Sequence, residues 1–247
     1  MPGDEREPVR APESSRMAAL LDRFYPDYRD ETWHYHRLIE AHLRPGGRVL
    51  DAGCGHRGDA AFLQAAGCQV VGIDLDPRVA QNPGLRFAIR GRLEQLPLAD
   101  LSVDLAICRY VAEHLKDPAV VLAEVARVLR PGGKFVLLTP NRWHYVTVIA
   151  RLTPLSFHRW VNARRGVAAG DVFPTFYRLN TCSRIATLAR RAGLQPVEIQ
   201  AIETRPNYLL FSVPTFYLGL LYERVVNRLS WLAPLRVNIL TVLEKPR

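Results

Sequence analysis

The sequence predicts an α/β protein built on a doubly wound, parallel sheet. From about residue 31 to residue 139, short apolar segments alternate with segments whose apolar residues have helical spacing. Strands that alternate with helices in this way favour a sheet with right-handed crossovers. With 247 residues, of which 48% are hydrophobic, the chain can bury one substantial core, and two full domains are not expected.

The first half of the chain predicts three of the strands. Apolar residues at helical spacing predict a helix over Glu31–Leu43, which Pro45, Gly46 and Gly47 end. The elements expected next are a strand at Arg48–Ala52, a helix at Asp59–Ala66 closed by Gly67, a strand at Gln69–Asp74, a helical segment near Arg78 and a strand at Arg86–Ile89. A loop over Gly91–Ser102 separates them from the second half.

The second half continues the alternation. Val103–Tyr110 is a near-continuous apolar run, as is typical of a parallel strand with helices on both faces, so we expect it at the centre of the sheet. The elements expected after it are a helix at Ala119–Leu129, a strand at Lys134–Thr139, a helix at Thr181–Ala192 and strands at Val197–Ile202 and Asn238–Glu244. The first helix and strand of this series are separated by Arg130-Pro131-Gly132-Gly133.

Three segments fall outside this alternation. Residues 1–16 are charged, contain several prolines and have no apolar run, which predicts a disordered leader before a single domain over 17–247. Residues from about 141 to 180 are rich in arginine and aromatic residues, whereas residues 204–236 are strongly apolar, and we expect both to be cap insertions. The longest uncharged stretch, Asn207–Tyr222, has 16 residues and falls short of the roughly 20 needed to span a bilayer.

The composition narrows the environment and the partners. The formal charge is +9, and all but three of the 33 basic residues are arginine, so the surface should attract anions. The four cysteines form no CxxC pair and lie mostly in apolar, strand-like contexts, which predicts a reducing compartment and no metal site. We therefore expect a cytoplasmic protein. The sequence makes no prediction of the oligomeric state.

A glycine-rich loop carries the clearest functional signal. Gly53, Gly55 and Gly58 form a GxGxxG pattern between a strand and a helix, where backbone N–H groups can approach a ligand closely. Asp74, 19 residues beyond Gly55, could bind a ribose, so the pattern alone also fits NAD or FAD. Asp51 just before the loop would repel a dinucleotide's pyrophosphate and would favour a cationic ligand that carries an amino group.

Four ordered motifs extend this signal over Val49–Asn141. They are VLDAGCGHRGD, VVGIDLDP, LEQLPLADLSVDLAICRYVAEHL and EVARVLRPGGKFVLLTPN. With them the sequence resembles the class I S-adenosylmethionine-dependent methyltransferases, in particular the group of quinone-biosynthesis and small-molecule methyltransferases. The resemblance implies a Rossmann-like doubly wound sheet of about seven strands, mostly parallel with an antiparallel last strand, and S-adenosylmethionine as the cofactor.

The resemblance also implies roles for individual residues. The methionine end of the cofactor would be held by Asp51, Gly53, Cys54 and Gly55, with Gly58 completing the loop. Asp74 would accept hydrogen bonds from both ribose hydroxyls, and Leu75 would pack on the adenine. Where related enzymes often have an acid that binds the adenine amino group, this chain has Arg92, while Leu93 offers backbone contacts and Glu94 a carboxylate.

The methyl group would lie beside the end of the fourth strand, at Arg109 and Tyr110. In-line transfer depends mainly on alignment, and a base helps when the acceptor is a hydroxyl or an acidic carbon. The catalytic candidates are His114, next to that strand end, and His144 and Tyr145, just after the fifth strand. We expect His34 and His36, by contrast, to have surface or packing roles.

The two insertions suggest the acceptor. The first carries arginines with aromatic residues between them, which fits an anionic or hydrophobic acceptor, membrane headgroups or a solvated basic face. The second, 204–236, combines apolar residues with arginines, and this fits a lid, a dimer contact or peripheral membrane association. The leading hypothesis is methyl transfer to a hydrophobic small molecule or a lipid-like acceptor.

Three alternatives remain open on the sequence. A nucleic-acid methyltransferase would explain aromatic residues among arginines, but we find no Asn-Pro-Pro-Tyr or similar tetrapeptide and disfavour nucleic acid as a partner. A non-catalytic S-adenosylmethionine-binding protein would explain Arg92 at the adenine position. An NAD-dependent oxidoreductase would rest only on the GxGxxG pattern and Asp74.

Overall fold

A computed structural model gives the structure of the chain and describes residues 15–56, 58–152 and 173–247. The strands are β1 (Arg48–Ala52), β2 (Gln69–Asp74), β3 (Phe87–Arg90), β4 (Val103–Arg109), β5 (Leu129–Pro140), β6 (Gln195–Ile202) and β7 (Asn238–Glu244). The α-helices are α1 (Ser15–Phe24), α2 (Glu31–Glu40), α3 (Ala60–Ala65), α4 (Pro118–Val128), α5 (Tyr145–Leu152), α7 (Cys182–Arg191) and α8 (Val213–Arg228). Short 3-10 helices are η1 (Pro77–Gln81), η2 (Ala112–His114) and η4 (Ser230–Leu235).

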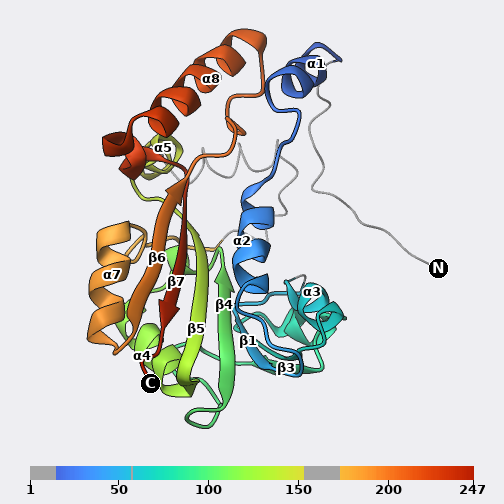
Figure 1. Cartoon of the computed structure of the whole chain (residues 1–247), viewed down its shortest axis with the longest axis vertical. Coiled ribbons are helices and arrows are strands. Elements are labelled where there is room, and N and C mark those ends of the chain that lie inside the picture. Colours follow the sequence, from blue (N-terminus) through green and yellow to red (C-terminus); the bar gives the residue numbers. More distant parts are fainter. Residues whose placement is uncertain (1–14, 57, 153–172) are drawn as a thin grey trace, which may run out of the picture.

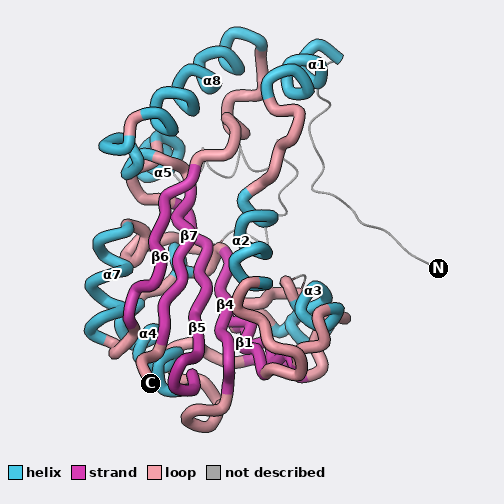
Figure 2. The backbone as a smooth tube through the Cα atoms, viewed as in Figure 1, coloured by secondary structure: helices cyan, strands magenta, loops and turns pink. Residues whose placement is uncertain are grey.

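The strands form one sheet in the order β3-β2-β1-β4-β5-β7-β6 (Figures 1 and 2). β7 is antiparallel to both of its neighbours, β5 and β6, and the other neighbouring strands pair in parallel. The expected α/β sheet of seven strands with an antiparallel last strand is confirmed. Because the parallel strands point the same way, their carboxyl ends meet at one edge, where such sheets bind ligands.

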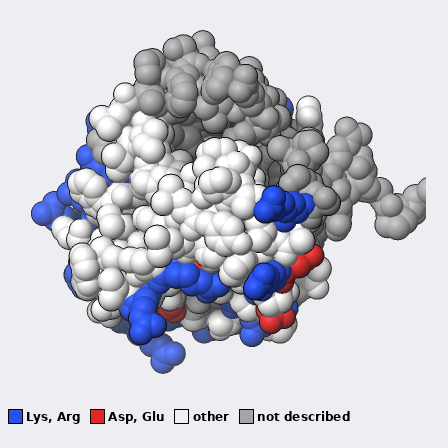
Figure 3. Space-filling model, turned by 90° about the horizontal axis from the view of Figure 1, so that it is seen from above, with Lys and Arg blue, Asp and Glu red and all other residues white. Residues whose placement is uncertain are grey.

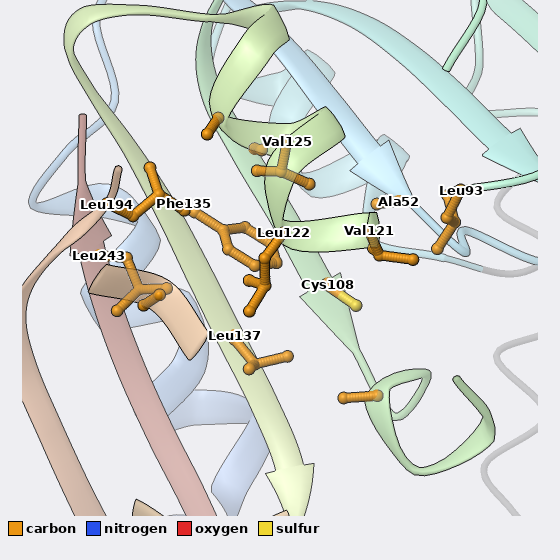
Figure 4. Packing of buried hydrophobic residues seen from close by; sticks show 14 of the residues in the cluster. Ala52, Leu93, Cys108, Val121, Leu122, Val125, Phe135, Leu137, Leu194 and Leu243 are labelled. Carbon is orange, nitrogen blue, oxygen red and sulfur yellow. The ribbon is translucent and has the colours of Figure 1, made fainter. Parts of the chain in front are cut away.

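Helices cover both faces of the sheet, and the strand residues alternate between two cores. Phe135 and Leu137 on β5 pack with α4 and α7, in the core shown in Figure 4. Val136 and Leu138, which alternate with these residues along β5, pack on the opposite face with α2 and α3. This period of two is the geometry of an extended strand, and a strand buried on both faces needs apolar residues at every position.

The boundaries differ from the sequence expectation mainly at β5. This strand begins at Leu129 and not at Lys134, because Leu129 already pairs with Val103. The Pro131-Gly132-Gly133 segment, which the sequence predicts as a break, is an irregularity inside the strand, where the register shifts between Val103 and Leu105. Gly132 has a φ of 79°, a left-handed conformation that glycine adopts without strain.

A group of helices lies above the carboxyl edge of the sheet in the view of Figure 1. α5 falls in the first expected insertion, and α8 with η4 forms most of the second. The sequence analysis did not predict α1, which packs Met17 and Leu21 against Phe216 of α8. Since α1 begins at Ser15, the last two residues of the expected leader are helical; the others lie outside the described residues, as does 153–172 of the first insertion.

Among the described residues, no helix combines the length and the apolar character that crossing a membrane requires.

Candidate functional site

The loop after β1 is held in a shape that only glycine fits at its first position. Gly53 has a φ of 78°, and a Cβ there would lie 2.3 Å from Cγ2 of Val111, which follows β4. Gly55 has a φ of 55° and faces open space. The loop therefore turns tightly under the carboxyl ends of β1 and β4 and leaves its backbone accessible to a ligand.

The carboxylate of Asp74, at the end of β2, fixes this loop. Its Oδ2 accepts a hydrogen bond from the Gly55 amide at 2.8 Å, and its Oδ1 accepts one from the Asp76 amide at 2.8 Å. A carboxylate has about four acceptor positions, so two remain for other donors. The side chain predicted to bind ribose hydroxyls thus also shapes the loop and keeps the capacity to accept from them.

Asp51 presents a buried carboxylate oxygen without a partner. Only 3% of the residue is exposed, and Oδ2 has no hydrogen-bond partner. Burial, followed by the nearby charge of Asp59, raises the pKa of Asp51 to about 8. A Cβ on Gly58 would lie 2.8 Å from this oxygen, so the glycine leaves the space beside it free. An unpaired buried carboxyl is costly, and a ligand with a cationic amino group would satisfy it.

Asp59 has the opposite character because it has two basic partners. Arg109 donates from Nε to its Oδ2 at 2.9 Å, and Nε2 of His36 lies 2.8 Å from its Oδ1. These contacts outweigh burial and lower the pKa of Asp59. Asp59 therefore stays ionised while Asp51 holds a proton. The expectation of a packing role for His36 also fits its ring, which stacks on Phe62 at 4.1 Å between centroids.

Comparisons with known proteins now identify the family. Residues 50–137 match the family described as "Methyltransferase domain". A ubiquinone biosynthesis O-methyltransferase of Bordetella pertussis is 30% identical to the chain over 185 residues, which are 68% of this chain and 70% of that protein. The chain belongs to the S-adenosylmethionine-dependent methyltransferases. Its cofactor is accordingly S-adenosylmethionine, whose sulfonium and amino group provide the cationic character that Asp51 favours.

Two further similarities agree with this family. A probable S-adenosylmethionine-dependent methyltransferase of Mycolicibacterium smegmatis is 42% identical over 135 residues, which are 52% of this chain and 51% of that protein. The chain thus spans about half the length of that relative. A solved S-adenosylmethionine-dependent methyltransferase of Mesorhizobium loti shares the fold with a TM-score of 0.57 and 18% identity, covering 86% of this chain and 96% of that one.

The other cofactor candidates divide into exposed and packed side chains. Leu75 is 59% exposed just beyond β2, where it can lie against a flat ring. Leu93 is buried in the core beside α4. Cys54 is also buried, and its Sγ fills the space where a Cβ on Gly72 would lie, 2.7 Å away. Both residues can therefore offer a ligand only their backbone atoms. The Arg92 side chain is 65% exposed, with its Nε 3.6 Å from Oε2 of Glu94.

Arg109 lies at the end of β4, as expected, but its guanidinium is engaged. The ion pair with Asp59 joins the end of β4 to the residue that precedes α3. Arg109 therefore positions the loop and the helix after it. Beside it, Tyr110 has a φ of 57°, and its hydroxyl donates to Glu31 at 3.3 Å and accepts from Asn238 at 3.3 Å.

His114 is the better placed of the two histidines predicted to act in catalysis. It ends η2, directly after β4, and Nδ1 lies 2.8 Å from the carbonyl oxygen of Pro174. Because a carbonyl oxygen only accepts, Nδ1 donates this hydrogen bond, and Nε2 on the other side of the ring takes no part in it. Nε2 is 4.0 Å from Glu113, whose pKa burial raises to about 7.

His144 occupies a closed aromatic environment. Its residue is 1% exposed, and neither ring nitrogen has a hydrogen-bond partner. The rings of Tyr145, Tyr208 and Tyr222 lie 4.2, 6.1 and 5.8 Å away. Burial lowers the pKa of His144 to about 4, so it is neutral near pH 7 and out of reach of an acceptor in this structure.

Two buried acids, Glu203 and Glu223, were not expected from the sequence. Glu203, just after β6, lies 3.6 Å from Nε2 of His144 and accepts from the Val237 amide at 2.8 Å. Burial raises the pKa of Glu203 to about 8. Glu223 on α8 accepts from the Tyr25 hydroxyl at 3.0 Å. An acid that follows the uncharged run Asn207–Tyr222 was the available signal for Glu223, whereas no local pattern marks Glu203.

Proposed function

We propose that this chain transfers a methyl group from S-adenosylmethionine to a hydrophobic small molecule or a lipid-like acceptor. The observation that carries the nature of the acceptor is the apolar surface around the carboxyl edge. On α8 the exposed side chains of Leu218, Leu221 and Val225 follow helical spacing, and Phe211 and Trp231 are 75% and 73% exposed before and after the helix. Contiguous exposed apolar surface of this kind marks a binding or membrane surface.

The donor end of the proposal rests on the loop geometry. The cofactor supplies the methyl group on a sulfonium. We assign its amino group to Asp51, its ribose hydroxyls to Asp74 and its adenine to the face of Leu75, with Gly53, Cys54, Gly55, Gly58 and Leu93 contributing backbone contacts. Arg109 acts through Asp59 to hold the loop in place.

The acceptor end rests on His114. Its Nε2 can take a proton from an acceptor hydroxyl or acidic carbon at the strand end, with Glu113 beside it to stabilise the charged ring. His144 and Tyr145 then serve to shape the acceptor side. A separate cleft of 530 Å³, a volume typical of small-molecule sites, is lined by the segment that joins α1 to α2, the end of β6 and part of α8; His114 is not among its lining residues. The name of the Bordetella pertussis relative also supports a small molecule as acceptor.

The acceptor class can be tested by labelling. The purified chain, incubated with methyl-labelled S-adenosylmethionine and a cell extract, should place the label in the organic-soluble fraction and not in RNA, DNA or water-soluble metabolites. The His114→Gln variant should bind the cofactor's demethylated product as wild type does but transfer roughly 100-fold more slowly. Label in nucleic acid would overturn the acceptor class, and donor binding without any labelled product would favour a non-catalytic protein.

Residues 204–236 also support peripheral contact with an anionic membrane. Seen from above, the described part of the surface is largely uncharged, with arginine and lysine gathered mainly toward its margin and few acids (Figure 3). Arg224 and Arg228 lie on α8 and are exposed, so the apolar side chains could insert while these groups meet lipid phosphates.

Vesicle sedimentation measures this contact. The wild type should sediment with vesicles that contain an anionic phospholipid and much less with purely zwitterionic ones. The double variant Leu218→Glu/Leu221→Glu should lose that binding, whereas Leu75→Glu, an equally exposed leucine away from α8, should keep it. Equal sedimentation of both variants would contradict a membrane role for α8.

A further inference from the structure

A second cleft, of 320 Å³, lies at the N-terminal end of α7. Its walls come from Arg142 and Trp143 after β5, from the segment between Tyr177 and Thr181, and from the first turns of the helix. Three arginines line it, Arg142, Arg178 and Arg184, and no acid is among its lining residues. Within the part of the chain that the structure describes, none of these arginines forms an ion pair with a carboxylate.

Two of the residues that line this cleft have buried polar atoms without partners. Nε of Arg142 is buried and has no acceptor. Asn180 is fully buried, and its Nδ2 donates to Thr139 Oγ1 at 2.6 Å and to the Pro140 carbonyl at 3.0 Å, which leaves Oδ1 without a donor. A buried guanidinium N–H and a buried amide oxygen both cost free energy unless a ligand completes them. Together they fit an anionic group that has a hydroxyl beside it.

The N-terminus of α7 adds to the same preference. Thr181 caps this ten-residue helix and accepts from the Arg184 amide at 3.2 Å. Ser183 and Thr187 provide further hydroxyls along the wall. The free N–H groups and partial positive charge of a helix start favour phosphate oxygens, and arginine matches their geometry.

The cleft is joined to the segment that carries His114. Arg178 donates from Nη1 to the Lys116 carbonyl at 2.7 Å, and the amides of Phe176 and Tyr177 donate to the Glu113 carbonyl at 2.7 and 3.1 Å. A group bound in the cleft would therefore contact residues that are hydrogen-bonded to the segment after β4, where His114 lies.

We propose that this cleft binds a phosphate ester with a neighbouring hydroxyl, and that this is the anionic head of the methyl acceptor. The second part rests on the proposed function, because it assigns the phosphate to the molecule that receives the methyl group. The acceptor is then an amphiphile with an apolar body and a phosphate head. The phosphate could belong to a free ester or to a lipid headgroup, and the shared chemistry is what the arginines recognise.

Glycerol 3-phosphate tests the site directly. Calorimetry should show saturable binding to the wild type and at least a tenfold loss for Arg184→Gln, because the variant removes a charge-assisted hydrogen bond to the phosphate. Arg190→Gln, an exposed arginine at the other end of α7, should bind as wild type does. Glycerol should not bind.

A parallel arm uses vesicles with and without phosphatidic acid. If only the phosphatidic acid vesicles bind, and binding depends on Arg184, the phosphate belongs to a lipid headgroup. If glycerol 3-phosphate binds in an Arg184-dependent way, the phosphate belongs to a free ester. Either result supports the proposal. Absence of both, or equal binding by Arg184→Gln, would overturn it. S-adenosylhomocysteine, titrated into the same samples, tests the donor site separately. If the wild type does not bind it, the proposed function is refuted, whereas the result for phosphate binding still stands.

Discussion

The Asp74→Ala variant should bind S-adenosylmethionine about 100-fold more weakly than wild type. The carboxylate would accept from two ribose hydroxyls, and hydrogen bonds to a charged group contribute about 1.5–3 kcal/mol each. Each 1.4 kcal/mol changes the dissociation constant tenfold, so the loss of two such bonds, even at the lower figure, weakens binding by about two orders of magnitude. The variant also frees the Gly55 amide, which loosens the loop. Calorimetric titration with the cofactor measures the loss.

Asp76→Ala is the matched control for this experiment. Asp76 lies two residues beyond Asp74, but its carboxylate is engaged by Arg78 and caps η1. Its removal should change donor affinity only a few-fold. Affinity that falls equally in both variants would mean that loss of the loop's structure, and not loss of ribose recognition, explains the effect of Asp74→Ala.

The Gly53→Ala variant should be destabilised by about 2–5 kcal/mol and should lose donor binding. The left-handed backbone costs an alanine about 1–2 kcal/mol, and forcing an extra methyl into a packed site costs roughly 1–3 kcal/mol more. The new Cβ would lie 2.3 Å from Cγ2 of Val111. Urea unfolding followed by circular dichroism measures the change in the free energy of unfolding.

Two companions separate these causes. Gly46→Ala has a similar φ of 72° with nothing within 4 Å of its Cβ, so it should show the backbone cost alone. Gly53→Ala/Val111→Ala removes the clash and should recover part of the loss relative to Gly53→Ala. A double variant no more stable than the single one would show that contact with Val111 is not the cause.

The sheet was predictable because its strands carry their signal locally. Strands buried in the middle of a sheet are rich in apolar residues whichever way they run, and β1, β2 and the antiparallel β7 follow the predicted bounds to the residue. The start of β5 was missed because Pro131-Gly132-Gly133 is a breaker pattern, and only pairing with β4 keeps that segment in the strand. α1 was missed although Met17 and Leu21 have helical spacing, because the charged residues before it dominate the composition.

The candidate site was predictable only in part. Asp51 and Asp74 lie at the ends of β1 and β2, and the glycines follow β1 in an ordered motif, so their positions could be inferred from the sequence. The pairing of Asp59 with Arg109, 50 residues apart, and of Glu203 with His144 depends on tertiary packing that no local pattern encodes. The arginines of the α7 cleft were visible as a basic segment, but their convergence required the fold.

The two carboxyls below the loop explain how the site distinguishes ligand charge. Asp59 stays ionised because Arg109 donates to it and His36 lies at hydrogen-bond distance, whereas Asp51 has no such partner and keeps a proton near neutral pH. Since the pKa of Asp51 in the folded chain is above its unfolded value, stability without ligand should fall as pH rises from about 4 to about 8. A cation favours the ionised form, so donor affinity should rise over the same range.

Proton release on donor binding tests the central claim most directly. S-adenosylmethionine is titrated into the wild type by calorimetry at pH 6.5, in two buffers that differ in ionisation enthalpy. The cationic amino group should lower the pKa of Asp51 from about 8, so binding should release close to one proton, and Asp51→Asn should bind more weakly and release none. Binding without proton release, or release that persists in Asp51→Asn, would contradict the placement of the donor's amino group at Asp51.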